Sequence, residues 1–557
     1  MNDTAHGPGP LSIAALCDAV VKGREPPPAP FVASLAAYRW CVVGTVCIGA
    51  FMGQVDSSIT QLLLPRLERE FGASLSTVSW VAVAYLLAMA AFMPIFGRLA
   101  DMLGRKLLYT GGFLLFVMGS AFCGLAPSLP VLIGFRVLQA IGAALLSSNS
   151  VAIIVTAAGP ERRGRALGIQ SAAQAIGLSV GPALGGLVLD TLGWQWVFWI
   201  NVPVGLVGAI AGWLIIPQTI DLPPDSRFDW KGALLIVPAL TALMSLLNNG
   251  HAWGLASPLF LACALLAIIL LTLFINAERR ATPPLIDLKL FRSAAFVGGN
   301  IAGLLSYAIL FGLMFLMPFM FVRAYGTSAL EAGLRLTMVP LALSAVAPVG
   351  GALYDQVGPR LLTVSGMLVC VAGLVLLFSA MDGTPDGMML VMLALAVFGL
   401  GLGLFISPNN SAIMAAAPTE LTGEAGGLVN VMRSLGTSVG IAAASALLSW
   451  WLATLTGSGH NTVGVSRDHL LAAGRAVIVL LVGFAVVAGA VSLLRSSRNR
   501  RQRGRPCLKA GKRRSRYPSL GRDDLAISAI VSRSGSNPRP GASGNVMKPS
   551  LGTGRPR

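Results

Sequence analysis

Two ionisable side chains, Asp56 and Arg136, lie inside long apolar stretches of the chain. A charge at the centre of a bilayer costs from about 2.5 kcal/mol upward, so such residues mark transport pathways or proton relays. Burial favours the protonated form of a carboxyl group, and a nearby cation favours the carboxylate. An acid that meets water on alternate sides of a membrane can therefore carry a proton across. The alternative for Asp56 is a static ion pair, and for Arg136 a structural pairing with backbone carbonyls.

The stretch GIQSAAQAIGLSVGPALGG combines Pro182 with Gly168, Gly177, Gly181, Gly185 and Gly186. In a soluble helix each internal glycine costs about 0.5–1 kcal/mol relative to alanine, and an interior proline costs about 3. Between helices in lipid, small residues instead permit close backbone approach, and glycines spaced by four form one smooth face. We predict a closely packed helix that is bent at its proline.

Membrane-spanning helices are the elements that position these residues. Of the 557 residues, 55% are hydrophobic and only 11% are charged, whereas about a quarter of a soluble protein is charged. Apolar runs of about twenty residues, each able to cross a bilayer core of roughly 30 Å, recur along the chain. We predict an all-α integral membrane protein with fourteen spans and no soluble domain large enough for an enzyme. The predicted spans are 41–64, 77–97, 107–126, 130–155, 166–189, 196–216, 232–249, 257–276, 295–321, 330–350, 361–380, 388–414, 425–451 and 470–494.

The net charge of +18 is concentrated at the C-terminus, where residues 495–557 hold 17 of the 41 Lys and Arg residues but two of the 23 acids. This segment lacks hydrophobic periodicity, so we predict a disordered basic tail. Beside fourteen spans, weak attraction to anionic lipid is favoured over nucleic-acid binding. Basic residues also cluster after the second, fourth and eighth spans, which by the positive-inside rule predicts that both termini are cytoplasmic.

The chain repeats itself. GRLADMLGR (97–105) and GALYDQVGPR (351–360) share the pattern G-x-L-x-D-x-x-G, and the glycines at 168, 177 and 181 recur at 427, 436 and 440. We predict two six-helix bundles, 41–216 and 295–494, separated by two inserted helices and linkers at 217–294. Residues 1–40 form an N-terminal cytoplasmic segment and residues 495–557 the tail. Such duplicated halves are typical of alternating-access transporters, whose site lies between them near the midplane. We expect Asp56 in a crevice shared by the two halves.

Several of these motifs resemble the major facilitator superfamily. GRLADMLGRK is similar to its cytoplasmic signature, and RVLQAIGAA (136–144) to its helix-4 motif, with Ala140 where glycine is usual. The pattern of residues 168–186 is similar to the helix-5 motif associated with exporters. VDSSITQLLLP (55–65), WQWVFWINVPVG (194–205) and FDWKGA (228–233) resemble segments of its fourteen-helix drug:proton antiporters, the EmrB/QacA-like branch. In the first segment Ser58, Thr60 and Gln61 stand where the family prefers Thr, Val and Asn.

The resemblance covers residues 40–494 and implies the fold of this superfamily, with Asp56 binding the proton and Arg136 tuning it. It also implies that the 168–186 helix seals the pathway, with an ordinary tightly packed helix as the alternative. The 97–106 loop and its repeat are interpreted as a conformational latch, formed by Gly97, Arg98, Asp101, Gly104, Arg105, Asp355 and Arg360. Polar residues within the spans could line a substrate cavity or merely join helices; these are Gln54, Gln139, Asn149, Gln174, Asn409, Asn410, Asn430 and Arg433.

These observations favour proton-coupled efflux of amphipathic, largely apolar small molecules across the cell membrane by a monomer. No Walker lysine loop, HExxH motif or paired-cysteine metal site is present, so we expect no cofactor, no metal and no enzymatic activity. The first alternative is another task on the same scaffold, either export of one dedicated metabolite or antibiotic, or proton-coupled nutrient import. The second is a non-transporting membrane receptor or scaffold with the basic tail as its output.

Overall fold

The computed structural model describes residues 25–159, 162–219, 229–253, 257–281, 284, 286–384, 387–418, 421–457 and 462–494. The side chains of residues 247–253, 352, 355, 422 and 423 are outside this description. The predicted basic tail, and most of the predicted N-terminal cytoplasmic segment, lie outside the described residues.

Every predicted span coincides with helix, and the described part of the chain contains no strand. The first seven spans are α3 (Tyr38–Phe71), α4 (Leu75–Leu103), α5 (Arg105–Gly124), α6 (Leu129–Ala158), α7 (Arg163–Thr191), α8 (Trp196–Trp199) with α9 (Asn201–Ile215), and α10 (Trp230–Trp253). The other seven are α11 (Pro258–Glu278), α12 (Ala294–Phe319) with the π-helical turn η2 (Met320–Ala324), α13 (Ala329–Leu336) with α14 (Met338–Val357), α15 (Pro359–Ala380), α16 (Met388–Ala416), α17 (Thr422–Thr456) and α18 (Arg467–Leu494). Two short elements, α2 (Pro30–Ala33) and the 3₁₀ turn η1 (Leu288–Arg292), precede α3 and α12.

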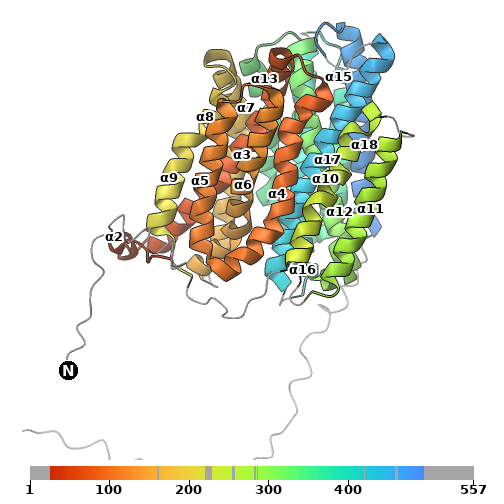
Figure 1. Cartoon of the computed structure of the whole chain (residues 1–557). Helices are drawn as coiled ribbons and strands as arrows, with labels where there is room; N and C mark the ends of the chain where they lie inside the picture. The colour runs from red at the N-terminus through yellow and green to blue at the C-terminus, as the bar shows by residue number, and fades with distance from the viewer. Residues whose placement is uncertain are drawn as a thin grey trace, which may run out of the picture. The chain divides into compact units, whose positions relative to one another are not determined.

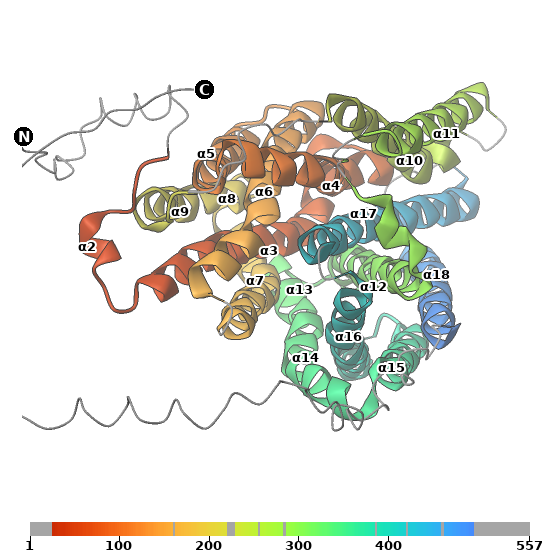
Figure 2. The same ribbon diagram turned by 90° about the horizontal axis from the view of Figure 1, so that it is seen from below.

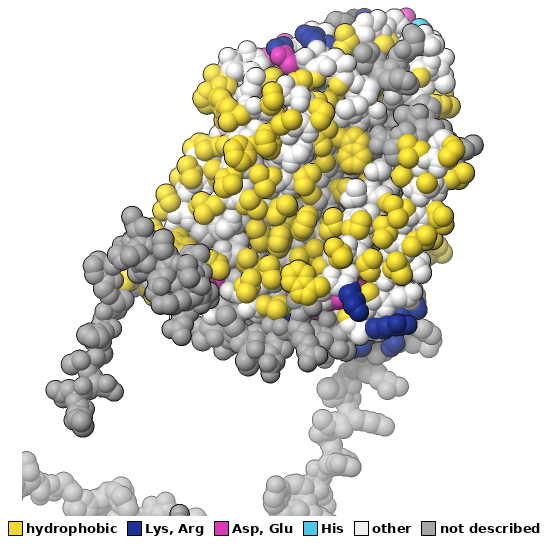
Figure 3. Space-filling model, in the orientation of Figure 1, with side chains coloured by type: hydrophobic (Ala, Val, Ile, Leu, Met, Phe, Trp, Pro, Cys, Tyr) yellow, Lys and Arg dark blue, Asp and Glu magenta, His cyan; other side chains and the backbone are white. Residues whose placement is uncertain are grey.

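Length and composition support the membrane assignment. Among the described residues, 13 helices are long and apolar enough to cross a bilayer. The remaining predicted span falls on α10, whose apolar portion Trp230–Leu246 is shorter. Figure 3 shows hydrophobic side chains over most of the middle of the visible face, with Lys and Arg near its two ends. Such a wide exposed apolar surface is stable only against lipid, which confirms the predicted all-α membrane fold.

The helices group into two sets by their contacts (Figures 1 and 2). In the first set, α3–α9, α3 packs on α6, α7 and α9, and α6 packs on α4 and α5. In the second set, α12–α18, α12 packs on α16, α17 and α18, and α16 packs on α14 and α15. The sets meet mainly at the pairs α4–α17 and α7–α13, and also at α7–α14 and α3–α12, while α10 contacts α11, α4 and α17. We call the end where α3 meets α4 the α3–α4 end, near α13 in Figure 1, and the other the α4–α5 end.

The sequence repeat corresponds to a repeat of structure. Gly104 and Gly358 each separate two helices with a positive φ, +104° and +87°, which is why the second glycine of both loop motifs is needed. The helical glycines repeat a contact as well. A Cβ atom at Gly177 of α7 would lie 2.6 Å from the Phe51 carbonyl oxygen of α3, and one at Gly436 of α17 would lie 2.2 Å from the Leu304 carbonyl oxygen of α12.

Two glycines of α17 give a matched test of this packing. A Cβ atom at Gly440 would lie 2.1 Å from the Ala308 carbonyl oxygen, whereas one at Gly427 would meet nothing within 4 Å. Because backbone must move to accommodate it, we expect Gly440→Ala to lose about 1–3 kcal/mol of stability. Gly427→Ala should be neutral or slightly stabilising. Thermal denaturation of both purified variants measures the difference, and equal midpoints would contradict the close α12–α17 contact.

Candidate functional site

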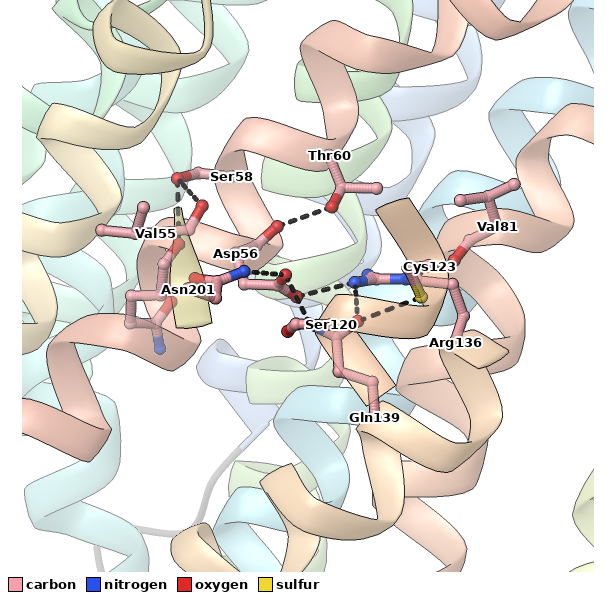
Figure 4. Close-up of polar contacts among 11 residues, drawn as sticks. Val55, Asp56, Ser58, Thr60, Val81, Ser120, Cys123, Arg136, Gln139 and Asn201 are labelled. Carbon is pink, nitrogen blue, oxygen red and sulfur yellow. Dashed lines mark hydrogen bonds and ion pairs between the residues drawn. The ribbon is translucent and has the colours of Figure 1, made fainter. Parts of the chain in front are cut away.

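Asp56 is the centre of a buried polar network on α3 (Figure 4). Its side chain is completely buried. The Asp56 Oδ2 atom accepts a hydrogen bond from Arg136 Nη1 of α6 at 2.8 Å. The Oδ1 atom accepts from Gln139 Nε2 of α6 at 2.9 Å and from Asn201 Nδ2 of α9 at 3.0 Å. Three N–H donors therefore satisfy the two carboxylate oxygens in a site without solvent contact.

Arg136 is held on several sides. Its Nε atom donates to the Val81 carbonyl oxygen of α4 at 3.1 Å, and its Nη1 atom also donates to Gln139 Oε1 at 2.6 Å. The guanidinium carbon lies 4.1 Å from the centre of the Tyr85 ring and 5.6 Å from that of Phe198. Cation–π contacts of this kind are strongest where water is absent. One guanidinium thus binds both a backbone carbonyl, as the structural alternative expects, and the acid. The role of Arg136 in proton coupling stays a prediction.

Gln139 links the ion pair to α5. Its Nε2 atom also donates to Ser120 Oγ at 2.7 Å, and its Oε1 atom lies 3.9 Å from the Cys123 sulfur. α5 approaches α6 closely here, because a Cβ atom at Gly119 would lie 2.6 Å from the Gln139 backbone. The amide is therefore fixed in place, and it accepts from Arg136 while donating to Asp56.

One expectation about Asp56 was wrong. We expected a crevice shared by the two halves, but its side-chain partners come from α6 and α9, within the first set. Asp56 is 0% exposed in this conformation. Solvent therefore reaches this side chain only if the first set rearranges.

The glycine face of α7 packs closely, as predicted, and the helix that it contacts is α3. Cβ atoms at Gly181 and Gly185 would clash with Ser58 and Ile59, as one at Gly177 would with Phe51. Gly186 instead faces α13 of the second set, since its Cβ would lie 2.4 Å from the Ala329 carbonyl oxygen.

The two ends of the α7 motif differ. A Cβ atom at Gly333 of α13 would lie 2.1 Å from the Pro182 carbonyl oxygen, so α7 packs closely between α3 and α13. The first glycine of the motif behaves differently. Gly168 is exposed, and a Cβ there would meet nothing within 4 Å, so it adds nothing to this packing.

In the predicted latch, Asp101 Oδ1 accepts from Arg105 Nη2 at 2.9 Å, and both side chains are partly exposed. Arg98 has a buried Nε atom without a hydrogen-bond partner among the described residues. It is also one of the cations that act on the Glu424 carboxylate of α17, across the two sets. Gly97 has open space around it, and Arg360 is exposed at the start of α15. The side chain of Asp355 lies outside the described residues.

The candidate cavity residues divide into two groups. Gln139, Asn149 and Asn409 are buried and hydrogen-bonded within the bundle, the latter two to the carbonyl oxygens of Leu145 and Gly299. The other five remain partly exposed and are still predictions; they are Gln54, Gln174, Asn410, Asn430 and Arg433.

Several residues of the site were missed from the sequence. Asn201, Phe198 and Tyr85 contact the ion pair, and the first two lie in the WQWVFWINVPVG segment, where an asparagine in an apolar run was a usable signal. Gln61, where the family prefers Asn, is 1% exposed, and its Oε1 atom has no hydrogen-bond partner in the part of the chain described here.

Glu25 is a further residue that the sequence did not indicate. Its carboxylate accepts from the backbone N–H groups of Leu107 at 3.0 Å and Thr219 at 2.5 Å. It therefore caps the N-terminus of α5, where negative charge is stabilising.

Comparison with known proteins gives a family match and several relatives. The family described as Major Facilitator Superfamily matches residues 46–441. The chain is 34% identical over 408 residues to "Riboflavin transporter RibZ" of Clostridioides difficile (strain 630), covering 72% of this chain and 87% of that protein. It is 32% identical to "Multidrug resistance protein Stp" of Mycobacterium tuberculosis (strain CDC 1551 / Oshkosh), covering 73% and 75%. It is 32% identical to "Tetracenomycin C resistance and export protein" of Streptomyces glaucescens, covering 74% and 76%.

A solved structure shares the fold. It is the inward-facing, unoccupied form of a bacterial homologue of the human lysosomal transporter Spinster, with a TM-score of 0.61 and 16% sequence identity. The alignment covers 83% of this chain and 98% of that chain.

Removing the cation tests the network. Arg136→Gln leaves the Asp56 carboxylate buried without its counter-charge, and breaking a buried ion pair in this way costs about 3–5 kcal/mol. We expect the double variant Asp56→Asn/Arg136→Gln to recover much of that stability, because it removes both charges. Thermal denaturation of the purified variants measures both. The control Arg105→Gln, which breaks a partly exposed pair, should cost about 1 kcal/mol or less. An Arg136→Gln variant as stable as the wild type would contradict the ion pair.

Proposed function

Because this chain belongs to the Major Facilitator Superfamily, a family of membrane transporters, we propose that it exports amphipathic small molecules in exchange for protons. The observation that carries the proposal is the Asp56–Arg136 pair, a charged couple with Nη1–Oδ2 at 2.8 Å and no solvent contact. Intramembrane ionisable residues of this kind are rare and functional by default.

Protonation of Asp56 is coupled to opening of the network. Arg136, Gln139 and Asn201 all direct N–H groups at its two oxygens. A protonated carboxyl carries a hydrogen on one oxygen and can accept fewer bonds. The added hydrogen would point at N–H groups that are themselves donors. The Asp56–Arg136 pair therefore separates when Asp56 is protonated and re-forms when the proton leaves. The ionised form of Asp56 thereby favours the arrangement of α3, α6 and α9 in which the pair is formed, and the protonated form favours the arrangement in which it is separated.

Alternating access would follow from movement of the two helix sets, which we propose are the six-helix bundles 41–216 and 295–494 with α10 and α11 inserted between them. The contacts within each set support this division. With the orientation given by the basic loops, the α4–α5 end faces the cytoplasm, as do both termini.

The proton gradient can supply enough energy. One elementary charge moving through about 150 mV releases roughly 3.5 kcal/mol. At about 1.4 kcal/mol per tenfold, this sustains a gradient of a few hundred-fold for a neutral substrate.

Nutrient import is the second candidate, because a relative with 34% identity is named a riboflavin transporter. The names of the multidrug resistance and tetracenomycin export relatives support efflux instead. The direction of transport separates the two: inside-out vesicles with an acidic lumen accumulate an exported dye, and right-side-out vesicles do not.

Proton coupling is tested with purified protein in weakly buffered detergent solution. We expect substrate binding to release protons from the wild type, and Asp56→Asn to release less than about one tenth as many. The matched control is Asp382→Asn. The Asp382 carboxylate accepts hydrogen bonds from the backbone N–H and the hydroxyl of Thr384 in an exposed loop, so this variant should behave as the wild type. Equal release from Asp56→Asn and the wild type would overturn the assignment.

The sealing role of α7 is tested by a pair of glycines. Gly177→Ala forces α7 away from the Phe51 backbone, whereas Gly168→Ala meets no atom. In proteoliposomes with an imposed pH gradient, we expect a several-fold higher proton leak from Gly177→Ala and none from Gly168→Ala. A Gly177→Ala protein that is less stable but does not leak would show that α7 serves packing alone.

A further inference from the structure

A second buried carboxylate lies near the other end of α3. Glu68 is 0% exposed. Its Oε1 atom accepts from the backbone N–H of Thr462 at 2.5 Å, and its Oε2 atom accepts a short hydrogen bond from the Thr462 hydroxyl. Arg323 Nη2 lies 3.6 Å from Oε2. We call Glu68, Arg323 and Thr462 the Glu68 cluster.

The Glu68 cluster joins the two helix sets. Glu68 belongs to α3 of the first set, Arg323 to η2, and Thr462 to the segment before α18 in the second set. Arg323 Nη2 also donates to the Pro65 carbonyl oxygen of α3 at 3.0 Å, and its Nε atom is buried without a partner among the described residues. The arginine is presented by a π-helical turn, an irregularity common at functional sites.

Further contacts join the sets at this α3–α4 end. Asp190 of α7 accepts from the backbone N–H groups of Leu330 at 2.8 Å and Ala329 at 3.3 Å, at the start of α13. Ser445 of α17 donates to the Leu75 carbonyl oxygen of α4 at 3.2 Å. Asp190 is exposed to solvent, whereas Glu68 is not. A change of charge therefore has the larger effect at Glu68, where solvent cannot screen it.

We propose that Glu68 is a second proton-binding site, which holds the α3–α4 end closed while it is ionised and lets that end open when it binds a proton. The ionised carboxylate attracts Arg323 and accepts two bonds from Thr462. A proton on Glu68 removes the charge that Arg323 faces and one of the acceptor sites. The contact between the sets is then weakened, and water reaches both side chains as the end opens.

Other charged groups lie on the elements around the Glu68 cluster, including Arg467, Asp468 and His469 at the start of α18. On the helix of Glu68, Arg69 acts on Arg323, and Arg66 pairs with the exposed Glu70 at 3.5 Å. On α13, Arg335 pairs with Glu331 at 3.6 Å. On α18, which packs against η2, Arg475 donates to the Met381 carbonyl oxygen at 2.8 Å. Lower pH therefore favours the open end through Glu68. That the α3–α4 end faces the acidic outer side rests on the proposed function. The contacts of the Glu68 cluster do not depend on that function.

The test measures opening directly by pulsed EPR. Spin labels are placed at Thr77 and Ser466, two exposed positions at the start of α4 and just before α18, after replacement of the seven native cysteines. Without substrate, we expect the label–label distance to lengthen as the pH falls from 8 to 5. Glu68→Gln should show the long distance already at pH 8, with the pH response reduced at least threefold. The control Glu331→Gln, an exposed acid, should respond as the wild type does.

Additional variants keep the test decisive. Arg323→Gln and Thr462→Val weaken the cluster without touching the acid, so each should raise the long-distance population at pH 8, even if Glu68→Gln does not fold. A Glu68→Gln protein that stays closed at pH 8, or that keeps the full pH response, overturns the proposal. An Asp56→Asn protein that loses the whole response, while Glu68→Gln keeps it, assigns the response to Asp56 and also overturns it. Because the EPR experiment contains no substrate, its result does not depend on the substrate-triggered proton-release test of the proposed function.

Discussion

The structure depends on placing a full ion pair in a medium that cannot solvate it. Asp56 and Arg136 are both buried, at 0% and 1% exposure. Each charge would cost several kcal/mol alone, and their attraction compensates only if the remaining donors and acceptors are also satisfied. The Gln139 and Asn201 amides, the Val81 carbonyl and the Tyr85 ring meet this requirement. These partners come from α4, α6 and α9, so the pair fixes how several helices pack around α3.

Glycine makes that packing possible. The acid meets α6 and α9 on one face of α3, and α7 comes very close on another face through Gly177, Gly181 and Gly185. α5 likewise approaches α6 at Gly119, beside Gln139. Helices in lipid gain little from hydrophobic burial against one another, so van der Waals contact and hydrogen bonds must supply the association. The glycine spacing and the buried polar network are therefore two parts of one solution.

Much of this could be predicted from the sequence, because the signals are local. Apolar length located every span, and the repeated G-x-L-x-D-x-x-G loops correspond to positive-φ turns at Gly104 and Gly358. The contact between Asp56 and Arg136 could not be predicted, because it depends on how α3 and α6 are rotated about their axes. The same reason explains why Asp56 was expected between the halves. Glu68 escaped notice because Arg66, Arg69 and Glu70 surround it and made it look like part of a solvated helix end.

The two acids of α3 suggest a division of labour along one helix. Asp56 and Glu68 are twelve residues apart, which is about 18 Å along the axis and roughly 120° around it. Asp56 therefore faces the interior of the first set, while Glu68 faces the second set and contacts Arg323 and Thr462. In the proposed mechanism, protonation of Asp56 changes how the first set packs, and protonation of Glu68 changes whether the two sets stay in contact at the α3–α4 end. Because α3 carries both groups, a shift of this helix would move both of them. Pro65 lies between them, and its carbonyl oxygen is bound by the same Arg323 that faces Glu68. The same guanidinium therefore contacts α3 twice, at the Pro65 carbonyl oxygen and at the Glu68 carboxylate.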